Sequence, residues 1–218
     1  FAGPEPGDGK DIEPSGVDGA TVENGVIHVR KRRHVIHFQG IGKRPALSLN
    51  RGFSAPITLS IEQRPQDLLF LARNDSDLVA RWQTLNTVLT DALIHACRAV
   101  RGQKVPHFSE GIVRAAGEIA DDDSLEPAYR ALALSLPAEA DIAREIGVNI
   151  DPDAIFVARE AMAAAVAAGN RAVFAATCDA SHAEGPFSPD AASAGRRALR
   201  NVLLDHLAVA EGDPDRAV

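Results

Sequence analysis

The sequence predicts an α+β fold that is mostly α, with a β part in residues 1–64 and a helical part in residues 65–218. Two patterns near the junction predict this order. Apolar residues first alternate with polar ones, as in a strand with one face in water, at Ile57, Leu59 and Ile61. Apolar residues then recur three or four positions apart, as on one face of a helix, at Leu78, Trp82, Leu85 and Leu89.

The β part is predicted to hold four short strands after a loop rich in glycine and proline in residues 1–25. The first two strands, Val26–Arg30 and His34–Phe38, are predicted to form a hairpin around a basic tip. The other two are predicted at Leu47–Leu49 and Ala55–Glu62. Four strands with one apolar face need a second layer to cover that face, which predicts that further strands precede this chain.

The helical part is predicted to contain about seven antiparallel helices with short links, as in an α-solenoid or an irregular bundle. Their predicted ranges are about 67–73, 78–100, 107–120, 125–136, 137–147, 152–180 and 189–208. Ser76 or Asp75 is predicted to cap the second of them. Two later helices are predicted to begin with a capping residue followed by proline, at Asp151-Pro152 and Ser188-Pro189. No strict sequence repeat supports the solenoid.

The composition excludes several classes of protein. With a net charge of −7 over 218 residues, the chain lacks the clustered basic surface of a nucleic-acid-binding protein. No uninterrupted apolar run is long enough to span a bilayer, so no membrane partner is predicted. The two cysteines, Cys97 and Cys178, show no disulfide pattern, which fits a reducing compartment and predicts a cytoplasmic location.

No residue of this chain is predicted to be catalytic, to bind substrate or to bind a metal. None of the seven histidines is followed by glutamate, so the sequence has no His-Glu-x-x-His zinc helix. His28 and His37 could face each other across the predicted hairpin, and Cys178 and His182 could share a helical face. Neither pair provides the three or four ligands of a stable metal site.

Three further features have two interpretations each. Arg30–Arg33 could bind an acidic partner, but a solvated tip is favoured because charge at exposed β edges deters aggregation. Asp121–Asp123 could suggest a calcium loop, but it lacks the glycine and the late glutamate of an EF-hand, so capping of the next helix is favoured. Trp82 lies in the middle of its apolar stripe and is predicted to be a structural residue of the core.

The two ends of the sequence predict a piece of a longer polypeptide. The chain starts at Phe1 without an initiator methionine, and it ends shortly after Asp213-Pro214, a pair that more often opens a helix. Apolar surface that other parts of the longer protein would cover should then remain exposed, so the piece is predicted to self-associate.

Five groups of residues occur in the same order as in a known family: Arg51–Leu59, Leu71–Asp77 with Arg81-Trp82, the segment Val26–Phe38 before them, Ile150–Pro152 with Arg159–Ala161, and Arg197–Asn201. Together they resemble the bacterial aminopeptidase N family of zinc metallopeptidases, over roughly residues 20 to 210. In that family a Phe-Ser-Ala-Pro-Val strand closes a small β domain. The resemblance therefore implies that Phe53 is a structural residue of a last sandwich strand.

By this resemblance, the whole protein has an N-terminal β domain, a thermolysin-like catalytic domain, a small β-sandwich and a C-terminal helical superhelix. Residues 1–64 would be part of an immunoglobulin-like β-sandwich, and residues 65–218 the first part of the superhelix. The parent would remove N-terminal residues from peptides with the help of zinc. This chain has neither His-Glu-x-x-His nor the family's Gly-Ala-Met-Glu-Asn segment, so no cofactor is implied here and the piece alone is predicted to be inactive.

The implied role of this piece is to scaffold and enclose the active-site chamber, with the catalytic domain of the same polypeptide as its partner. Two other functions stay open: a stand-alone helical-repeat module that binds a protein, and a helical domain that binds a small molecule. A His-Glu-x-x-His motif upstream in the same reading frame would favour the aminopeptidase. A ligand in a cavity of the bundle would favour the last alternative.

Overall fold

The computed structural model describes residues 15–23, 26–39, 44–53, 56, 61–182 and 187–211. The chain divides into two compact units, residues 1–81 and 82–218, each with its own packing. Among the described residues, short antiparallel strands come first and helices make up most of the rest. The predicted fold class, α+β and mostly α, is therefore confirmed.

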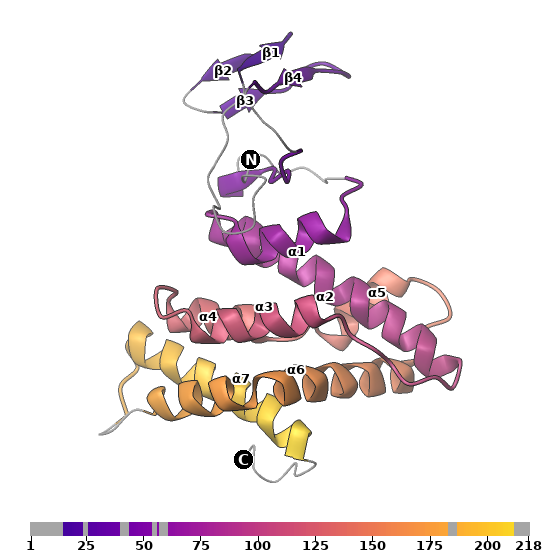
Figure 1. Ribbon diagram of the computed structural model, residues 1–218, viewed down its shortest axis with the longest axis vertical. Coiled ribbons are helices and arrows are strands. Elements are labelled where there is room, and N and C mark those ends of the chain that lie inside the picture. The colour runs from indigo at the N-terminus through magenta and orange to yellow at the C-terminus, as the bar shows by residue number, and fades with distance from the viewer. Residues whose placement is uncertain are drawn as a thin grey trace. The chain divides into compact units, whose positions relative to one another are not determined.

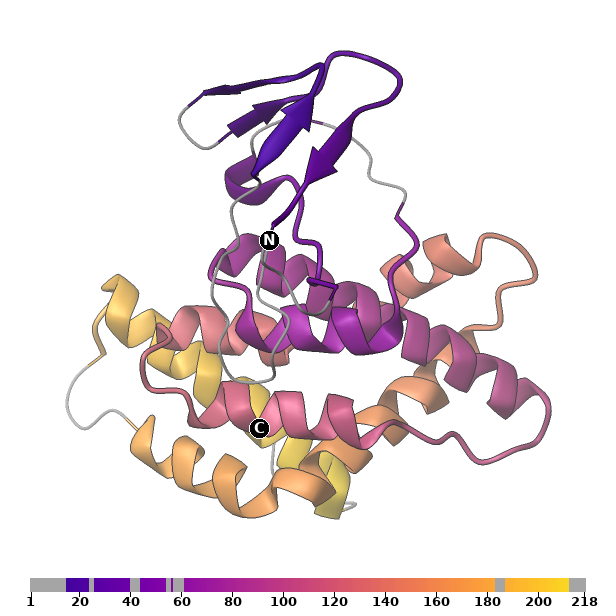
Figure 2. The ribbon, with the colours of Figure 1, turned by 45° about the horizontal axis from the view of Figure 1, so that its top comes forward.

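The first unit begins with four three-residue strands that pair two by two (Figure 2). Strand β1 (Gly16–Asp18) pairs with β4 (Val35–His37), and β2 (Thr21–Glu23) pairs with β3 (Val26–His28), both antiparallel. The predicted hairpin between residues 26–30 and 34–38 is therefore wrong, although both segments contain a strand. Their partners come from the stretch predicted to be loop, where valine and threonine supply the side chains that strands favour.

The basic segment between β3 and β4 is closed by a histidine. The backbone amides of Arg30 and Lys31 donate to His34 Nε2 at 3.2 and 2.9 Å. His34 Nδ1 lies 3.3 Å from the carbonyl oxygen of Asp18. Because the ring is held between these groups, the chain turns at Arg30–Arg33 without bringing β3 and β4 together.

The rest of the first unit also differs in part from the prediction. Residues 47–49 form no strand, and Ala46 makes a single bridge. Arg51–Phe53 forms a turn of 3₁₀-helix, so Phe53 does not lie in a strand. The predicted strand Ala55–Glu62 lies largely outside the described residues, and its described members, at 56, 61 and 62, are in no strand. Helix α1 (Pro65–Asn74) follows and buries Leu71 against Ala46 and Phe70.

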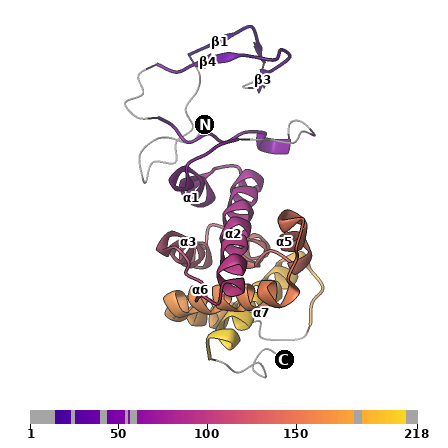
Figure 3. The ribbon, with the colours of Figure 1, turned by 90° about the vertical axis from the view of Figure 1, so that its right-hand side faces the viewer.

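The helices after α1 follow the predicted order (Figure 1). They are α2 (Leu78–Arg101), α3 (Glu110–Asp121), α4 (Pro127–Leu134), α5 (Glu139–Ile146), α6 (Pro152–Ala180) and α7 (Ala191–Glu211). The boundary between the two units falls inside α2. Figure 3 shows α2 lengthwise, with α3 and α5 on either side of it in that view.

Helices α3 and α6 run in the same direction, side by side (Figure 1). Asn170 Nδ2 donates to the carbonyl oxygen of Val113 at 2.7 Å, and Thr177 Oγ1 donates to that of Ala120 at 3.2 Å. Both donors and both acceptors are seven residues apart, two turns of helix, so the register is kept along the contact. Glycines permit the close approach, since a Cβ at Gly117 would lie 2.1 Å from Asn170 Oδ1. We call Val113, Gly117, Ala120, Gly169, Asn170 and Thr177 the α3–α6 seam.

Helices α4 and α7 also run in the same direction. Gly195 near the start of α7 lies against Ala128 near the start of α4, and His206 further along α7 bonds to Leu134 at the end of α4. The pair α3–α4 is thus followed by the pair α6–α7 in the same orientation, which is the arrangement of a helical-repeat protein. The structure shows a structural repeat that the sequence does not show. The contacts between the paired helices depend on a few small and polar residues, which leave no repeated sequence pattern.

Helix α6 is the one described helix long and apolar enough, by length and composition, to cross a membrane. The sequence predicted no membrane-spanning helix, because charged residues interrupt the apolar stretches of α6. A third of its most apolar window is buried, and α6 packs against α3, α5 and α7. This packing accounts for the buried third of that window.

Candidate functional site

The candidate metal ligands do not come together. Among the described residues, no group of three or more His, Cys, Asp or Glu side chains could hold a metal ion. His28 lies opposite Thr21 and His37 opposite Gly16, so the two histidines are not cross-strand neighbours as expected. His37 Nε2 instead lies 3.2 Å from a carboxylate oxygen of Asp18.

The two cysteines are buried and free. Burial raises the pKa of the Cys97 thiol and also that of Cys178. A raised pKa leaves less thiolate at neutral pH, and thiolate is the reactive and metal-binding form. These residues therefore have the environment of core side chains.

The junction between the β and α parts is held by a network of polar contacts, which we call the junction clamp: Arg51, Gly52, Asp75, Ser76 and Asp77. Arg51 Nη2 donates to Ser76 Oγ and lies 3.4 Å from Asp75 Oδ1. The amide of Gly52, at a φ of 63°, donates to Asp77 Oδ2 at 2.7 Å. The two segments that carry the strongest family resemblance thus lie against each other, 25 residues apart in sequence.

Asp77 also caps helix α2. Its Oδ1 accepts from the amide of Ala80 at 2.9 Å, one of the amides that have no partner within a helix. The predicted caps, Ser76 and Asp75, serve other purposes, since Asp75 is buried and accepts from the amide of Asp77 at 3.0 Å. Burial raises the pKa of the Asp77 carboxyl, and hydrogen bonds from the Ala80 and Gly52 amides lower it. The hydrogen bonds outweigh burial, so the pKa is lowered overall.

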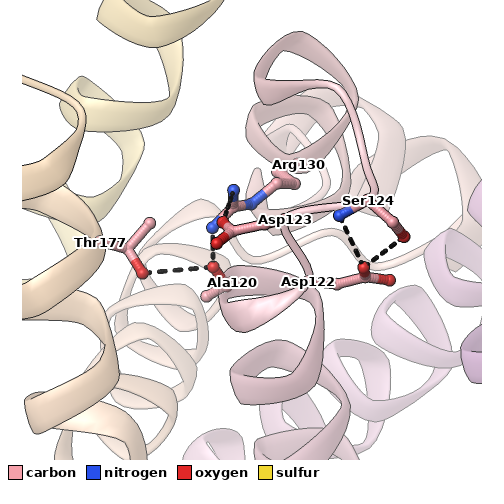
Figure 4. A network of polar contacts seen from close by, with 6 residues as sticks. All are labelled: Ala120, Asp122, Asp123, Ser124, Arg130 and Thr177. Carbon is pink, nitrogen blue, oxygen red and sulfur yellow. Dashed lines mark hydrogen bonds and ion pairs between the residues drawn. The ribbon is translucent and has the colours of Figure 1, made fainter.

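The acidic run after α3 does not cap the next helix as predicted (Figure 4). Helix α4 starts with Pro127 after Glu126, which makes no side-chain cap. Asp122 closes a local turn by accepting from the amide and hydroxyl of Ser124, at 3.1 and 2.5 Å. Asp123 accepts from Arg130 at 3.0 Å.

Arg130 is a buried charge that ties α4 to the end of α3 (Figure 4). Its Nη2 donates to the carbonyl oxygen of Ala120, which also accepts from Thr177 on α6. Three helices thus share one carbonyl group at the end of the seam. Local sequence patterns do not reveal this role, because Arg130 and Thr177 lie 47 positions apart.

The starts of the last two helices differ from each other. Asp151 accepts from the amide of Ala154 at 3.0 Å, and Pro152 occupies the first turn of α6. At α7 the cap is Asp190, which accepts from Ser193, so the predicted start at Ser188-Pro189 is wrong by two residues. Hydrogen bonds from the Ser188 hydroxyl and the Ser193 amide strongly lower the pKa of Asp190. Trp82 is half-buried, while Leu85 and Leu89 of the same stripe are buried.

A pocket with a volume of about 320 Å³ lies in the second unit. It lies where the end of α4 meets α6 and α7. Its apolar walls are Leu134, Leu136, Ala163, Val202 and Val209. Its polar lining is Ser135, Arg159, Glu160, Asp205 and His206. Sequence reasoning missed this site, because its residues come from three separate helical segments.

Pairs of parallel helices follow a small β part in the sequence, so the protein belongs to the class of helical-repeat domains joined to a β segment. The chain belongs to the family described as a domain of unknown function (DUF3458_C) with ARM repeats, whose model matches residues 65–218. A companion model, described as a domain of unknown function (DUF3458) with an Ig-like fold, matches residues 8–62.

Two relatives of this chain are bacterial proteins named aminopeptidase N. Aminopeptidase N of Caulobacter vibrioides is 35% identical over 182 residues, 84% of this chain and 21% of that protein. Aminopeptidase N of Escherichia coli is 26% identical over 189 residues, 86% of this chain and 21% of that protein. The resemblance to bacterial aminopeptidase N is therefore confirmed, and the chain spans about a fifth of the length of these relatives.

A solved structure shows the same fold. The structure described as Legionella pneumophila aminopeptidase A in complex with aspartic acid matches with a TM-score of 0.70. The match covers 86% of this chain and 22% of that chain at 22% identity. At this identity the match establishes the shared fold.

Proposed function

We propose that this chain is a non-catalytic part of an aminopeptidase N-like zinc metallopeptidase that removes N-terminal residues from peptides. The observation that carries the proposal is the match to aminopeptidase N over 84% of the chain. The junction clamp supports a scaffolding role, since it ties the end of the β segment to the start of α2. In this role the chain supports the catalytic domain of the same polypeptide and encloses the active-site chamber.

Zinc chemistry does not fit the residues present here. Among the residues that the structure describes, three potential ligands never come together, and the sequence has no His-Glu-x-x-His motif. No chemical step is therefore assigned to this chain. We propose that the zinc ligands and the catalytic groups belong to the rest of the longer protein.

The test uses the full reading frame and this chain side by side. The full protein should release N-terminal residues from peptides and hydrolyse an alanyl anilide, with one zinc per chain by metal analysis. The 218-residue chain should do neither. Tight stoichiometric zinc or hydrolysis by this chain alone would contradict the proposal.

The enclosing role has a separate test. Removal of residues 82–218 from the full protein, which opens the chamber in this proposal, should favour long polypeptides over the small anilide. The measurement is the ratio of kcat/KM for a long peptide to that for the anilide. An unchanged ratio, with anilide hydrolysis retained, would argue against enclosure.

Exposed apolar residues at the α5–α6 corner support a partner surface: Val148, Ile150, Phe156 and Val157 are 74%, 46%, 54% and 45% exposed. We propose that the catalytic domain covers them. The alternative, a stand-alone repeat module, would use the same corner for another protein. Sedimentation should show self-association of this chain that Phe156→Ser reduces, and a strictly monomeric chain would speak against a covered surface.

We also propose a cytoplasmic location. The two buried, free thiols fit a reducing compartment. Fractionation of cells that make the full protein tests this, and recovery in a secreted or membrane fraction would contradict it.

A further inference from the structure

The pocket between α4, α6 and α7 contains a buried histidine whose hydrogen bonding is half satisfied. His206 is 4% exposed, and its ring lies 5.6 Å from that of Phe174. Its Nε2 lies 3.0 Å from the carbonyl oxygen of Leu134. A carbonyl oxygen only accepts, so Nε2 carries the hydrogen and donates it.

The other ring nitrogen of His206, Nδ1, is therefore a hydrogen-bond acceptor. In this tautomer Nδ1 keeps a lone pair, and it is buried without a hydrogen-bond partner among the described residues. An acceptor buried in this way costs free energy, and such groups in folded proteins commonly bind water or a ligand.

Two carboxylates line the same pocket. Glu160 comes from α6 and Asp205 from α7, and both residues are exposed. Neither forms an ion pair with any residue in the described part of the chain. Both are hydrogen-bond acceptors at neutral pH.

The arginine in the pocket does not balance these charges. Arg159 Nε donates to the carbonyl oxygen of Pro137 at 3.0 Å, and its Nη1 lies 3.5 Å from a carboxylate oxygen of Glu139. Arg159 is thus directed to the start of α5. The pocket is left with an excess of negative charge and of acceptors, beside the apolar walls already described.

We propose that this pocket binds a small organic primary ammonium ion, with its alkyl part against the apolar walls. An ammonium group carries three N–H donors and one positive charge, which match His206 Nδ1 and the two carboxylates. The volume of about 320 Å³ suits a ligand of a few heavy atoms. The inference does not depend on the proposed peptidase role.

Calorimetric titration with n-butylammonium chloride tests the proposal. The 218-residue chain should bind n-butylammonium, and it should not bind n-butyrate, which has the opposite charge. Tetramethylammonium, a cation without N–H donors, should bind at least about tenfold more weakly, the factor that corresponds to 1.4 kcal/mol. Equal affinity for the two cations would overturn the assignment, because the acceptors would then play no part.

Variants at the two exposed carboxylates locate the site. Combined Glu160→Gln and Asp205→Asn should weaken n-butylammonium binding by about tenfold or more, while the overall fold is retained because both residues are exposed. Glu145→Gln, which removes an exposed charge from α5 outside the pocket, should leave the affinity unchanged. If Glu145→Gln weakened n-butylammonium binding as much, the effect would come from the net charge of the protein, and the proposed site would be wrong.

Nitrogen NMR of His206 gives a readout that a structural role would not move. Binding should shift the Nδ1 resonance, because a lone pair gains a donor, and should leave Nε2 largely unchanged. Binding without a change at Nδ1 would overturn the assigned contact. If the longer protein did not bind n-butylammonium, the proposal of a small free ligand would also be wrong. Another segment of the polypeptide would then fill the pocket.

Discussion

The junction clamp and the α3–α6 seam join distant segments by different means. The clamp uses charged side chains and backbone amides, with Arg51 against Asp75 and Ser76 and with Asp77 on the Gly52 amide. The seam uses neutral donors on backbone carbonyls, and glycines that let two helices approach. We therefore expect the clamp to respond to charge and pH, and the seam to respond to volume.

The largest effect should come from added volume in the seam. A Cβ at Gly117 would lie 2.1 Å from Asn170 Oδ1, and Asn170 is already held by its bonds to Val113 and Val166. Gly117→Ala should lower the free energy of unfolding by about 3 kcal/mol, the upper end of typical overpacking, despite the better helix propensity of alanine. Urea denaturation followed by circular dichroism measures it.

The matched control for this change is Gly102→Ala at the end of α2. Its added Cβ would lie 3.4 Å from the nearest atoms, an ordinary contact. The control should cost less than about 1 kcal/mol, as surface substitutions do. If the two variants were equally stable, close packing would not be what distinguishes the seam.

The next effect concerns the charge at the end of the seam. Arg130→Met keeps much of the side-chain volume but removes the donors to Ala120 and Asp123. We expect a loss of about 2 kcal/mol, typical of hydrogen bonds from a charged group, because Asp123 is 95% exposed and is not left buried. A loss near zero would mean that Thr177 alone satisfies the Ala120 carbonyl. Thermal unfolding of the two proteins provides the comparison.

The sequence predicted the order of the helices well, because each helix carries its own periodic pattern. The prediction of strand pairing was wrong, because the local pattern of a strand does not indicate which segment it pairs with. One signal was present: Asn24-Gly25 separates the segments of β2 and β3, and Asn-Gly between two strands is a strong hairpin signal. The pairing of β1 with β4 has no such local sign, since 16 residues separate them.

Contacts that depend on tertiary packing could not be read from the sequence. Three acidic or hydroxyl residues precede α2, and only the position of the Gly52 amide selects Asp77 as the cap. The pocket brings Leu134 next to His206, 72 positions along the chain. Such pairs follow from how helices stack, which periodicity within one helix does not encode.

A smaller and pH-dependent effect should come from the clamp. Asp77→Ala removes the cap of α2 and the acceptor for Gly52, which should cost about 1–2 kcal/mol. Asp77→Asn keeps an acceptor for the cap and should cost less. The pKa of Asp77 is lowered in the folded protein, so its charge contributes stability above the ordinary carboxyl pKa of about 4, and this contribution is lost as the pH falls below it.

Denaturation of the parent and of Asp77→Asn between pH 7 and pH 3 measures this dependence. The parent should lose more stability than the variant as the pH falls, because the variant has no carboxyl to protonate at this position. Equal loss in both would assign the acid sensitivity to other carboxyl groups, such as Asp190 in the second unit, whose pKa is also lowered. The contrast in pH response between clamp and seam would then not hold.

The smallest effect should come from one neutral hydrogen bond of the seam. Thr177→Val has nearly the same shape but no hydroxyl to donate to Ala120. The carbonyl keeps Arg130 as a donor, so no buried acceptor is left alone, and the loss should be about 0.5–1 kcal/mol with no dependence on pH. In the Arg130→Met background the same change leaves Ala120 without either donor and should cost clearly more. A double-mutant cycle by urea denaturation measures this difference, and strict additivity would show that the two donors do not share the carbonyl.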